Sequence, residues 1–318
     1  MLDYHVDKDP TTDEVLGSMD LSGKHVFVTG ASAGLGLETC RALAVRGAHV
    51  VGTVRDVAKG REIIAPLTAG AAGTVELLEL DLGSLESVRR CAEMMLKAGK
   101  PIDVLICNAG VMAAPQGVTA DGFETQFGVN HLGHFLLVNL LLPLLRDGAR
   151  ILVLSSMAHR MADIDLDDPN FRRKLYDKWE AYGAAKTANC LFAVELDKRL
   201  RARGIRAAAI HPGVVATKLN RHMPDEEWNA FEEAQTAHHD PHHRIKSIPE
   251  GAATTVWAGF VAGADEIGGH YCQDCGVPAD NDAPEVPGAG PRAYAMDPDR
   301  AARLWQISEE MVGQTFNA

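Results

Sequence analysis

The stretch His25-Val-Phe-Val-Thr29-Gly30-Ala31-Ser32-Ala33-Gly34-Leu35-Gly36 joins an apolar run to the start of a segment with helical character. A strand that enters a glycine-rich turn and then a helix lets the backbone approach a pyrophosphate, which the helix N-terminus can hold. The spacing is G-x-x-x-G-x-G, not the commoner G-x-G-x-x-G, and a glycine-rich turn without a ligand is the alternative. Its position favours a dinucleotide site made by Gly30, Ser32, Ala33, Gly34, Leu35 and Gly36.

Short runs rich in Val, Ile and Leu alternate with helical stretches from Lys24 onward. Their apolar content is nearly continuous, as expected of strands that are covered on both faces. The candidate strands are residues 25–29, 49–54, 75–80, 104–107, 151–154 and 205–210. This alternation predicts an α/β fold: a Rossmann-type, doubly wound parallel sheet of about seven strands, with helices on both faces.

The same pattern predicts one domain over residues 21–278. An N-terminal extension covers residues 1–20, and a tail covers residues 279–318 with a short helix at 298–312. Two regions interrupt the alternation: a charged insertion at 158–178 and a long polar segment at 214–248. Long connections at the carboxyl edge of a parallel sheet are where ligands bind, so we expect residues 214–248 to be the substrate loop.

Charge and hydropathy exclude several classes of protein. The 318 residues include 31 Lys and Arg against 43 Asp and Glu, a formal charge of −12, which argues against nucleic-acid binding. The N-terminus lacks the basic and apolar regions of a signal peptide, and the apolar run at 135–145 is too short to span a bilayer. Six scattered cysteines suit reduced thiols better than disulfides. We therefore expect no membrane span and a cytoplasmic location.

The end of the second candidate strand, Val54-Arg55-Asp56, bears on the choice of cofactor. About 20 residues past the glycines of such a fold, an acid holds the ribose hydroxyls, whereas an Arg accepts a 2′-phosphate. Arg55 favours NADP(H) over NAD(H). Asp56 keeps NAD(H) possible, because a shift of one residue in the turn would present a carboxylate instead.

Tyr182-Gly-Ala-Ala-Lys186 places a phenol and an ammonium four residues apart in a segment that reads as a helix, so both side chains lie on one face. A nearby positive charge favours the phenolate and lowers the pKa of a tyrosine, which would suit acid–base chemistry. Alone, the spacing also fits a surface helix with an extended Lys side chain.

Together these motifs resemble the short-chain dehydrogenase/reductase family over roughly residues 21–219. The matches occur in the family's order: the glycine motif, Asp81, Asn108-Ala109-Gly110, Asn130, Ser156, Tyr182 with Lys186, Pro212-Gly213 and Thr217. The stretch Val129-Asn-His-Leu-Gly-His-Phe-Leu136 and the wide gap before Tyr182 look most like the branch of retinol dehydrogenases and similar carbonyl reductases.

The resemblance implies a catalytic set of Asn130, Ser156, Tyr182 and Lys186. Tyr182 would exchange a proton with a ketone or aldehyde and its alcohol, and Ser156 would hydrogen-bond the substrate oxygen. Ser155 is the rival, since only one of two adjacent strand residues points at the site. Lys186 would lower the pKa of Tyr182. Asn130 would kink its helix and hold a water linked to Lys186, or would be a polar residue satisfied by its neighbours.

The resemblance also implies cofactor contacts. Asp81, beside Leu82, would accept from the adenine amino group, and Asn108, Ala109 and Gly110 would line the adenine-ribose side. Tyr182 and Lys186 would contact the nicotinamide ribose. Thr217, after Pro212 and Gly213, would bind the carboxamide or a phosphate. Family members commonly form homodimers or homotetramers through the helices that bear Asn130 and Tyr182.

Other functions and features stay open. The fold could serve a non-catalytic NADP(H)-binding regulator, or C=C reduction or epimerisation, instead of carbonyl chemistry on a bulky apolar substrate. Met223, Trp228 and Phe231 could form a lid or anchor the substrate loop. Metal binding is a weak alternative for Cys272 with Cys275, and for the histidines in a solvated loop, His238, His239, His242 and His243.

Overall fold

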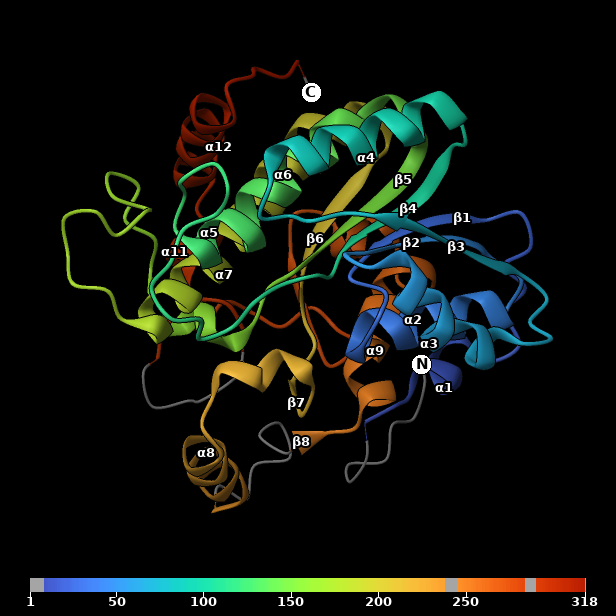
Figure 1. The fold of residues 1–318 in the computed structure, drawn as a ribbon, viewed down its shortest axis with the longest axis horizontal. Helices are drawn as coiled ribbons and strands as arrows, with labels where there is room; N and C mark the ends of the chain where they lie inside the picture. The colour runs from blue at the N-terminus through green and yellow to red at the C-terminus, as the bar shows by residue number, and fades with distance from the viewer. Residues whose placement is uncertain (1–8, 238–244, 284–289, 318) are drawn as a thin grey trace.

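The computed structural model describes residues 9–237, 245–283 and 290–317. A seven-stranded sheet lies at its centre, with the order β3-β2-β1-β4-β5-β6-β9 and parallel pairing throughout (Figure 1). The strands are β1 (His25–Thr29), β2 (His49–Val54), β3 (Thr74–Glu79), β4 (Ile102–Cys107), β5 (Leu145–Leu154), β6 (Arg206–His211) and β9 (Tyr271–Gln273). The order reverses between β1 and β4, so a crevice is expected beyond the carboxyl ends of these two strands.

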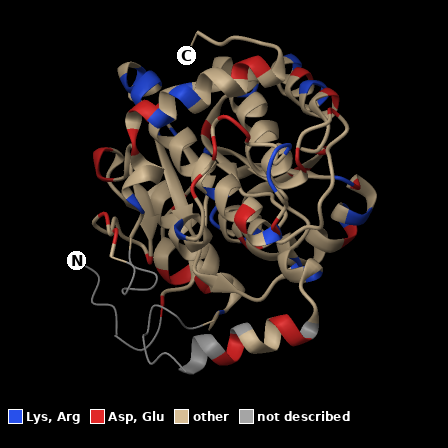
Figure 2. Cartoon of the chain, turned by 90° about the vertical axis from the view of Figure 1, so that its left-hand side faces the viewer, with Lys and Arg blue, Asp and Glu red and all other residues tan. Residues whose placement is uncertain are grey.

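Helices cover both faces of the sheet (Figure 1). On one side lie α1 (Thr12–Leu16), α2 (Gly34–Val45), α3 (Val57–Thr68) and α9 (Ile248–Val256). On the other lie α4 (Leu85–Ala98), α6 (Gly133–Leu141) and α7 (Lys178–Leu200), with α12 (Pro298–Val312) packed on α7. The remaining short helices are α5 (Thr125–Phe127), α10 (Ala264–Ile267) and α11 (Ala293–Met296). Lys, Arg, Asp and Glu residues lie mainly on the helices and loops around the sheet (Figure 2).

The two faces explain why the strands are apolar throughout. In β1, Phe27 belongs to the core under α4, α6 and α7, whereas Val28 belongs to the core under α2 and α9. In β4, Leu105 and Ile106 divide in the same way. Each face of the sheet buries apolar side chains, which confirms the prediction of a doubly wound parallel sheet.

Several element bounds differ from those predicted. Strand β5 begins at Leu145, not at residue 151, because Leu145 already pairs with Ile102 of β4. Its Arg146-Asp147-Gly148 reads as a loop in the sequence. The seventh strand, β9, has only three residues and no sequence signal of its own. Residues 214–248 are not one long loop: they contain β7 (Val214–Val215), η5 (Lys218–His222), α8 (Asp225–Ala237) and β8 (Ile245–Lys246).

Most of the apolar run at 135–145 belongs to a longer helical segment, Thr125–Leu144, and its last residue begins β5. By length and composition it is the one candidate membrane span in the described residues, and 72% of its apolar window is buried inside the protein. Phe127, Leu132, Phe135 and Leu136 lie in the core with α7, which is typical of a core helix. A π turn at Gly128–Leu132 interrupts this helix at Asn130.

The described segments near the two ends of the chain, α1 and α12, pack on the sheet domain. Thr11 caps α1, and Val15 and Leu16 are buried near α9. In α12, the Trp305 ring lies 5.0 Å from the Phe135 ring and 6.1 Å from the Phe192 ring, measured between centroids. Helix α12 therefore covers part of the outer face of α6 and α7.

Candidate active site

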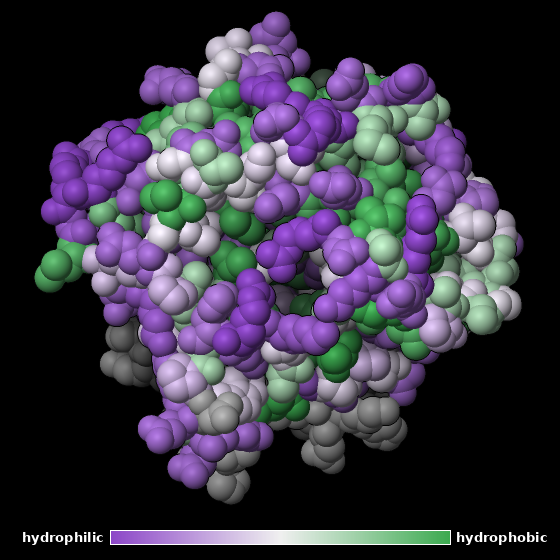
Figure 3. Space-filling view, in the orientation of Figure 1, coloured by the Kyte–Doolittle hydropathy of each residue, from purple (hydrophilic) through white to green (hydrophobic). Residues whose placement is uncertain are grey.

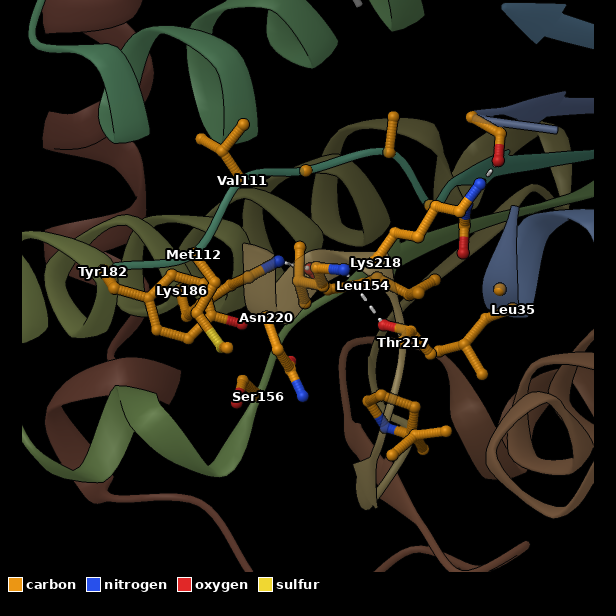
Figure 4. A pocket seen from close by; sticks show the side chains of 18 of the residues that line it. Leu35, Val111, Met112, Leu154, Ser156, Tyr182, Lys186, Thr217, Lys218 and Asn220 are labelled. Carbon is orange, nitrogen blue, oxygen red and sulfur yellow. Dashed lines mark hydrogen bonds between the residues drawn. The ribbon is translucent and has the colours of Figure 1, made fainter. Parts of the chain in front are cut away.

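A cavity of about 670 Å³ opens at the carboxyl edge of the sheet. Figure 4 shows it from close by, with Leu35, Ser156, Tyr182, Lys186 and Thr217 around it. Nearly all predicted site residues line it: Gly30, Ser32, Ala33, Gly34, Leu35, Arg55, Asp81, Leu82, Asn108, Ala109, Gly110, Ser156, Tyr182, Lys186, Pro212, Gly213 and Thr217. The face drawn in Figure 3 is hollowed near its centre, inside a largely hydrophilic rim.

The glycine turn has the geometry that an anion site needs. Gly30 and Gly34 have φ values of 75° and 54°, which favour glycine. The N-cap of α2 is Ala33, which makes no side-chain hydrogen bond to the first turn, so the N–H groups of that turn are left for another acceptor. Gly36 does not line the cavity. A Cβ there would lie 2.3 Å from the carbonyl oxygen of Gly30, so Gly36 permits close packing instead.

Hydrogen bonds tie the ends of β1 and β4 together. Thr29 Oγ1 accepts from the backbone N–H groups of Asn108 at 2.9 Å and Ala109 at 3.0 Å. The Asn108 side-chain amide donates to the Thr29 carbonyl at 2.8 Å. These bonds fix the crevice at the switch point, and Asn108 uses its amide for that purpose.

Asn130 is fully buried and does not line the cavity. Its Oδ1 accepts from Val111 N at 2.8 Å, and its Nδ2 donates to Val111 O at 2.9 Å. The side chain is thus satisfied by its neighbours, as one of the two sequence interpretations expected. A π turn interrupts the helix around Asn130, which is where the other interpretation expected a kink.

His134 connects these two networks, a link that the sequence analysis missed. Its Nδ1 lies 2.9 Å from the Asn130 carbonyl oxygen, and its Nε2 lies 2.9 Å from Thr29 Oγ1. The carbonyl can only accept, so Nδ1 carries the proton and Nε2 accepts from the Thr29 hydroxyl. Burial lowers the pKa of His134 to about 4, so the ring is neutral near pH 7. A histidine in an otherwise apolar helix was the available signal.

Helix α7 brings Tyr182 and Lys186 to the cavity. Both are almost completely buried, and the Lys186 Nζ lies 5.7 Å from the centroid of the Tyr182 ring. Lys186 Nζ donates to the carbonyl oxygen of Leu154, at the end of β5, at 2.9 Å. The backbone therefore holds the ammonium beside the phenol.

The two serines after β5 point in different directions. Ser155 Oγ donates to the backbone oxygen of Lys186 at 2.9 Å, inside the protein. Ser156 Oγ accepts from Ala158 N at 3.1 Å, and both Ser156 and Tyr182 line the cavity. Of the pair, Ser156 is the hydroxyl placed beside Tyr182.

Burial dominates the ionisation of the Tyr–Lys pair. It raises the pKa of Tyr182 to about 12, although the Ser156 side chain lowers it. Burial also lowers the pKa of Lys186 to about 8. The expectation of a lowered tyrosine pKa is therefore wrong for the protein alone, because the loss of hydration outweighs the effect of Ser156. Near pH 7 the phenol is therefore protonated.

Arg55 and Asp56 have different environments. Arg55 lines the cavity at the end of β2. Asp56 is the N-cap of α3, and its Oδ1 accepts from Lys59 N at 3.0 Å. Thr217, at the other side of the cavity, caps η5 and packs against the glycine turn: a Cβ on Gly34 would lie 3.3 Å from Thr217 Cγ2.

The end of the cavity near Tyr182 is lined by large apolar side chains: Met112, Met157, Met161, Trp179, Met223 and Trp228. Glu227 of α8 accepts from Trp179 Nε1 at 2.8 Å and from Lys178 Nζ at 2.5 Å. Thus α8 is attached to the start of α7, and Met223 and Trp228 contribute to the cavity wall. The side chain of Phe231 and the four loop histidines, His238, His239, His242 and His243, lie outside the described residues.

Two arginines from distant segments complete this end, and neither was predicted. Arg160, from the insertion at 158–178, and Arg292, from the tail, both line the cavity. Arg160 donates to backbone oxygens of Asn281 and Gly290, and Arg292 N donates to His159 Nε2 at 3.2 Å. The tail is therefore part of the site wall.

A parallel sheet with a glycine turn at its switch point and a Tyr–Lys pair at the same edge defines a dinucleotide-binding α/β protein. The family model for short chain dehydrogenases matches residues 24–228. The chain belongs to the short-chain dehydrogenase/reductase family of oxidoreductases.

Relatives match over nearly the whole chain. The short-chain dehydrogenase/reductase prx1 of Penicillium roqueforti is 38% identical over 96% of this chain and 91% of its own length. Retinol dehydrogenase 12 of Bos taurus is 39% identical over 93% of this chain and 88% of its own. A crystal structure of an uncharacterised protein from Mycobacterium paratuberculosis is similar with a TM-score of 0.70 and 36% identity, covering 97% of this chain and 99% of that one. A Pseudomonas aeruginosa RhlG/NADP complex has a TM-score of 0.62 at 27% identity, over 78% and 93%.

Proposed function

We propose that this protein is an NADP(H)-dependent oxidoreductase that interconverts a bulky apolar ketone or aldehyde and its alcohol, with Tyr182 as proton donor and acceptor. The observation that carries the proposal is one cavity lined both by the glycine turn and by Ser156, Tyr182 and Lys186. A dinucleotide held at the turn and a carbonyl held at the hydroxyls would therefore share one enclosure.

The chemistry assigned to the side chains follows from their positions. A nicotinamide cofactor supplies or accepts the hydride when it is bound. Ser156 and Tyr182 line the same cavity, and both hydroxyls could donate to one carbonyl oxygen. Tyr182 is protonated at neutral pH, so its Oη can give its proton to the developing alkoxide. Lys186 then stabilises the remaining phenolate while its ammonium is charged.

Two observations favour NADP(H) over NAD(H) at a site that could hold either dinucleotide. The uncapped N-terminus of α2 leaves N–H groups for a pyrophosphate, which both cofactors contain. Arg55 is in the cavity wall at the position that faces the adenosine ribose in this fold. The Asp56 carboxylate caps α3, which argues against its use for the ribose hydroxyls of NAD(H). The NADP bound by RhlG is consistent with this choice.

The substrate class rests on the wall near Tyr182. Methionine and tryptophan side chains present a broad apolar surface, and methionine adapts to irregular shapes. The similarity to retinol dehydrogenase 12 also favours an apolar substrate. A bulky apolar carbonyl compound fits this wall better than a small polar one.

The test is Tyr182→Phe together with Ser156→Ala, assayed against a panel of ketones, aldehydes and secondary alcohols with both cofactors. Loss of the proton donor is expected to lower kcat by about 10²–10⁴-fold, with NADPH binding retained. Ser155→Ala is the matched control, because its hydroxyl faces α7. Unchanged turnover in Tyr182→Phe, or products reduced only at C=C bonds, would contradict the proposal.

A further inference from the structure

The cofactor end of the cavity carries three cations from two separate segments. Arg55 ends β2, while Lys218 and Arg221 belong to η5, and all three line the cavity. No ion pair with a carboxylate is recorded for any of them within the described ranges, although the chain has a net charge of −12. Basic side chains gathered in this way on an acidic protein indicate an anionic ligand.

Local contacts fix η5 beside the glycine turn. Thr217 caps η5 by accepting from Leu219 N at 3.2 Å, and the same side chain packs against Gly34. At the base of the segment, β7 pairs with β8 through Val214 with Ile245 and Val215 with Lys246. The position of η5 is therefore set by the start of α2 on one side and by this small sheet on the other.

Arg221 and Arg55 line the same cavity, and η5, which carries Arg221, lies beside the glycine turn. Arg221 donates through Nη1 to the Lys218 carbonyl at 3.2 Å, and that is its one recorded hydrogen bond among the described residues, so most of its five donors are left for a ligand. Burial and the nearby charge of Arg55 both lower the pKa of Arg221. Two guanidinium groups that repel each other are stabilised when an anion binds between them.

We propose that Arg221 and Arg55 together hold the 2′-phosphate of NADP(H). The proposal rests on the proposed function and extends it to a residue of the substrate loop. The 2′-phosphate fits better than the pyrophosphate, because Arg55 ends β2, where this fold places the adenosine ribose, whereas the pyrophosphate lies at the N-terminus of α2. A guanidinium binds two phosphate oxygens in one plane, so two of them can enclose a phosphate dianion.

The phosphate-binding segment η5 lies next to α8 in the chain. Only Met223 and Pro224 separate η5 from α8, and Met223 and Trp228 line the substrate end of the cavity. The segment that recognises the cofactor phosphate thus continues directly into the wall that contacts the substrate.

The experiment measures dissociation constants of NADPH and NADH for the wild type and Arg221→Ala by fluorescence titration. Loss of a charge-assisted phosphate contact is expected to weaken NADPH binding by about tenfold or more, and to leave NADH binding within about twofold. The NADPH affinity of the wild type should also fall more steeply with salt than that of the variant. His222→Ala is the matched control: His222 is exposed on the same η5 and does not line the cavity.

A second titration uses adenosine 2′,5′-bisphosphate and adenosine 5′-monophosphate, which lack the nicotinamide. Arg221→Ala should weaken the bisphosphate alone. Equal weakening of NADPH and NADH would place Arg221 at the pyrophosphate or in a structural role, and would overturn the inference. Unchanged NADPH binding would also overturn it, while an Arg55→Ala variant with a lost preference for NADPH would leave the proposed function standing. A wild type that prefers NADH would contradict both.

Discussion

Lys186 Nζ donates to the carbonyl oxygen of Leu154 at 2.9 Å. This bond joins α7 to the end of β5, two residues before Ser156. It therefore fixes the helix that carries Tyr182 and Lys186 relative to the strand that leads to Ser156. Such a buried Lys has few acceptors, and its pKa is lowered to about 8 by burial. The charge on Lys186 is therefore sensitive to pH within the range where enzymes are assayed.

We expect the kcat/KM for NADPH to fall as pH rises through about 8. Lys186 has a folded-state pKa below its ordinary value of 10.5, so it loses its charge near pH 8, while Tyr182 stays protonated to about pH 12. This kinetic parameter reports groups in the free enzyme. In Lys186→Arg the guanidinium keeps its charge, so the alkaline decline should disappear even if overall activity is lower. A wild-type profile that is flat to pH 10 would contradict this assignment.

His134→Phe should weaken NADPH binding and destabilise the fold. The change leaves the buried carbonyl of Asn130 without the His134 donor, which costs about 1–3 kcal/mol, and it releases Thr29 at the switch point. The control is His131→Phe. His131 lies in the same segment but bonds to Ser308 of α12, so its loss should lower stability without changing the dissociation constant of NADPH.

The same residue gives a test by acid unfolding. The folded-state pKa of His134 is about 4, below its ordinary 6.5, so the unfolded chain binds the proton first as pH falls. The free energy of unfolding should therefore decrease between about pH 6.5 and pH 4. Urea titrations across this range should show a shallower decrease in His134→Phe than in the wild type. Equal slopes would mean that His134 is not buried in its neutral form.

Glu227→Ala should raise the KM for the carbonyl substrate and leave NADPH binding within about twofold. Glu227 attaches α8 to Lys178 and Trp179, and α8 holds Trp228 at the cavity wall. Glu227→Gln should be intermediate, because its amide oxygen still accepts from the Trp179 indole. Glu226→Ala is the control, since Glu226 is the exposed neighbour on the same helix. A KM unchanged in Glu227→Ala would show that α8 does not shape the substrate site.

Local motifs predicted most of the fold and the centre of the site. The glycine turn, Arg55, Ser156, Tyr182 and Lys186 are each recognisable from a few neighbouring residues, and the sheet places them together. Two other features join segments that are far apart in the sequence: the bond between Thr29 and His134, and the presence of Arg221 and Arg55 in one cavity wall. The spacing of apolar residues along the chain carries no information about such contacts. Strand β9 was missed for another reason: three residues on an edge carry too little pattern.

Trp305→Ala should be the most destabilising single change outside the site. Trp305 is 1% exposed and packs on Phe135 and Phe192, with the Arg199 guanidinium 4.2 Å from its ring centroid. Truncation of such a side chain costs about 3–5 kcal/mol, measured by urea unfolding. Its buried indole N–H has no hydrogen-bond partner among the described residues, so Trp305→Phe should cost far less.

Light scattering, which measures self-association, tests the role of α12 in covering this face. Because α12 covers the α6 and α7 face, Trp305→Ala should self-associate more readily than Trp305→Phe, and equal behaviour of the two variants would contradict that role for α12.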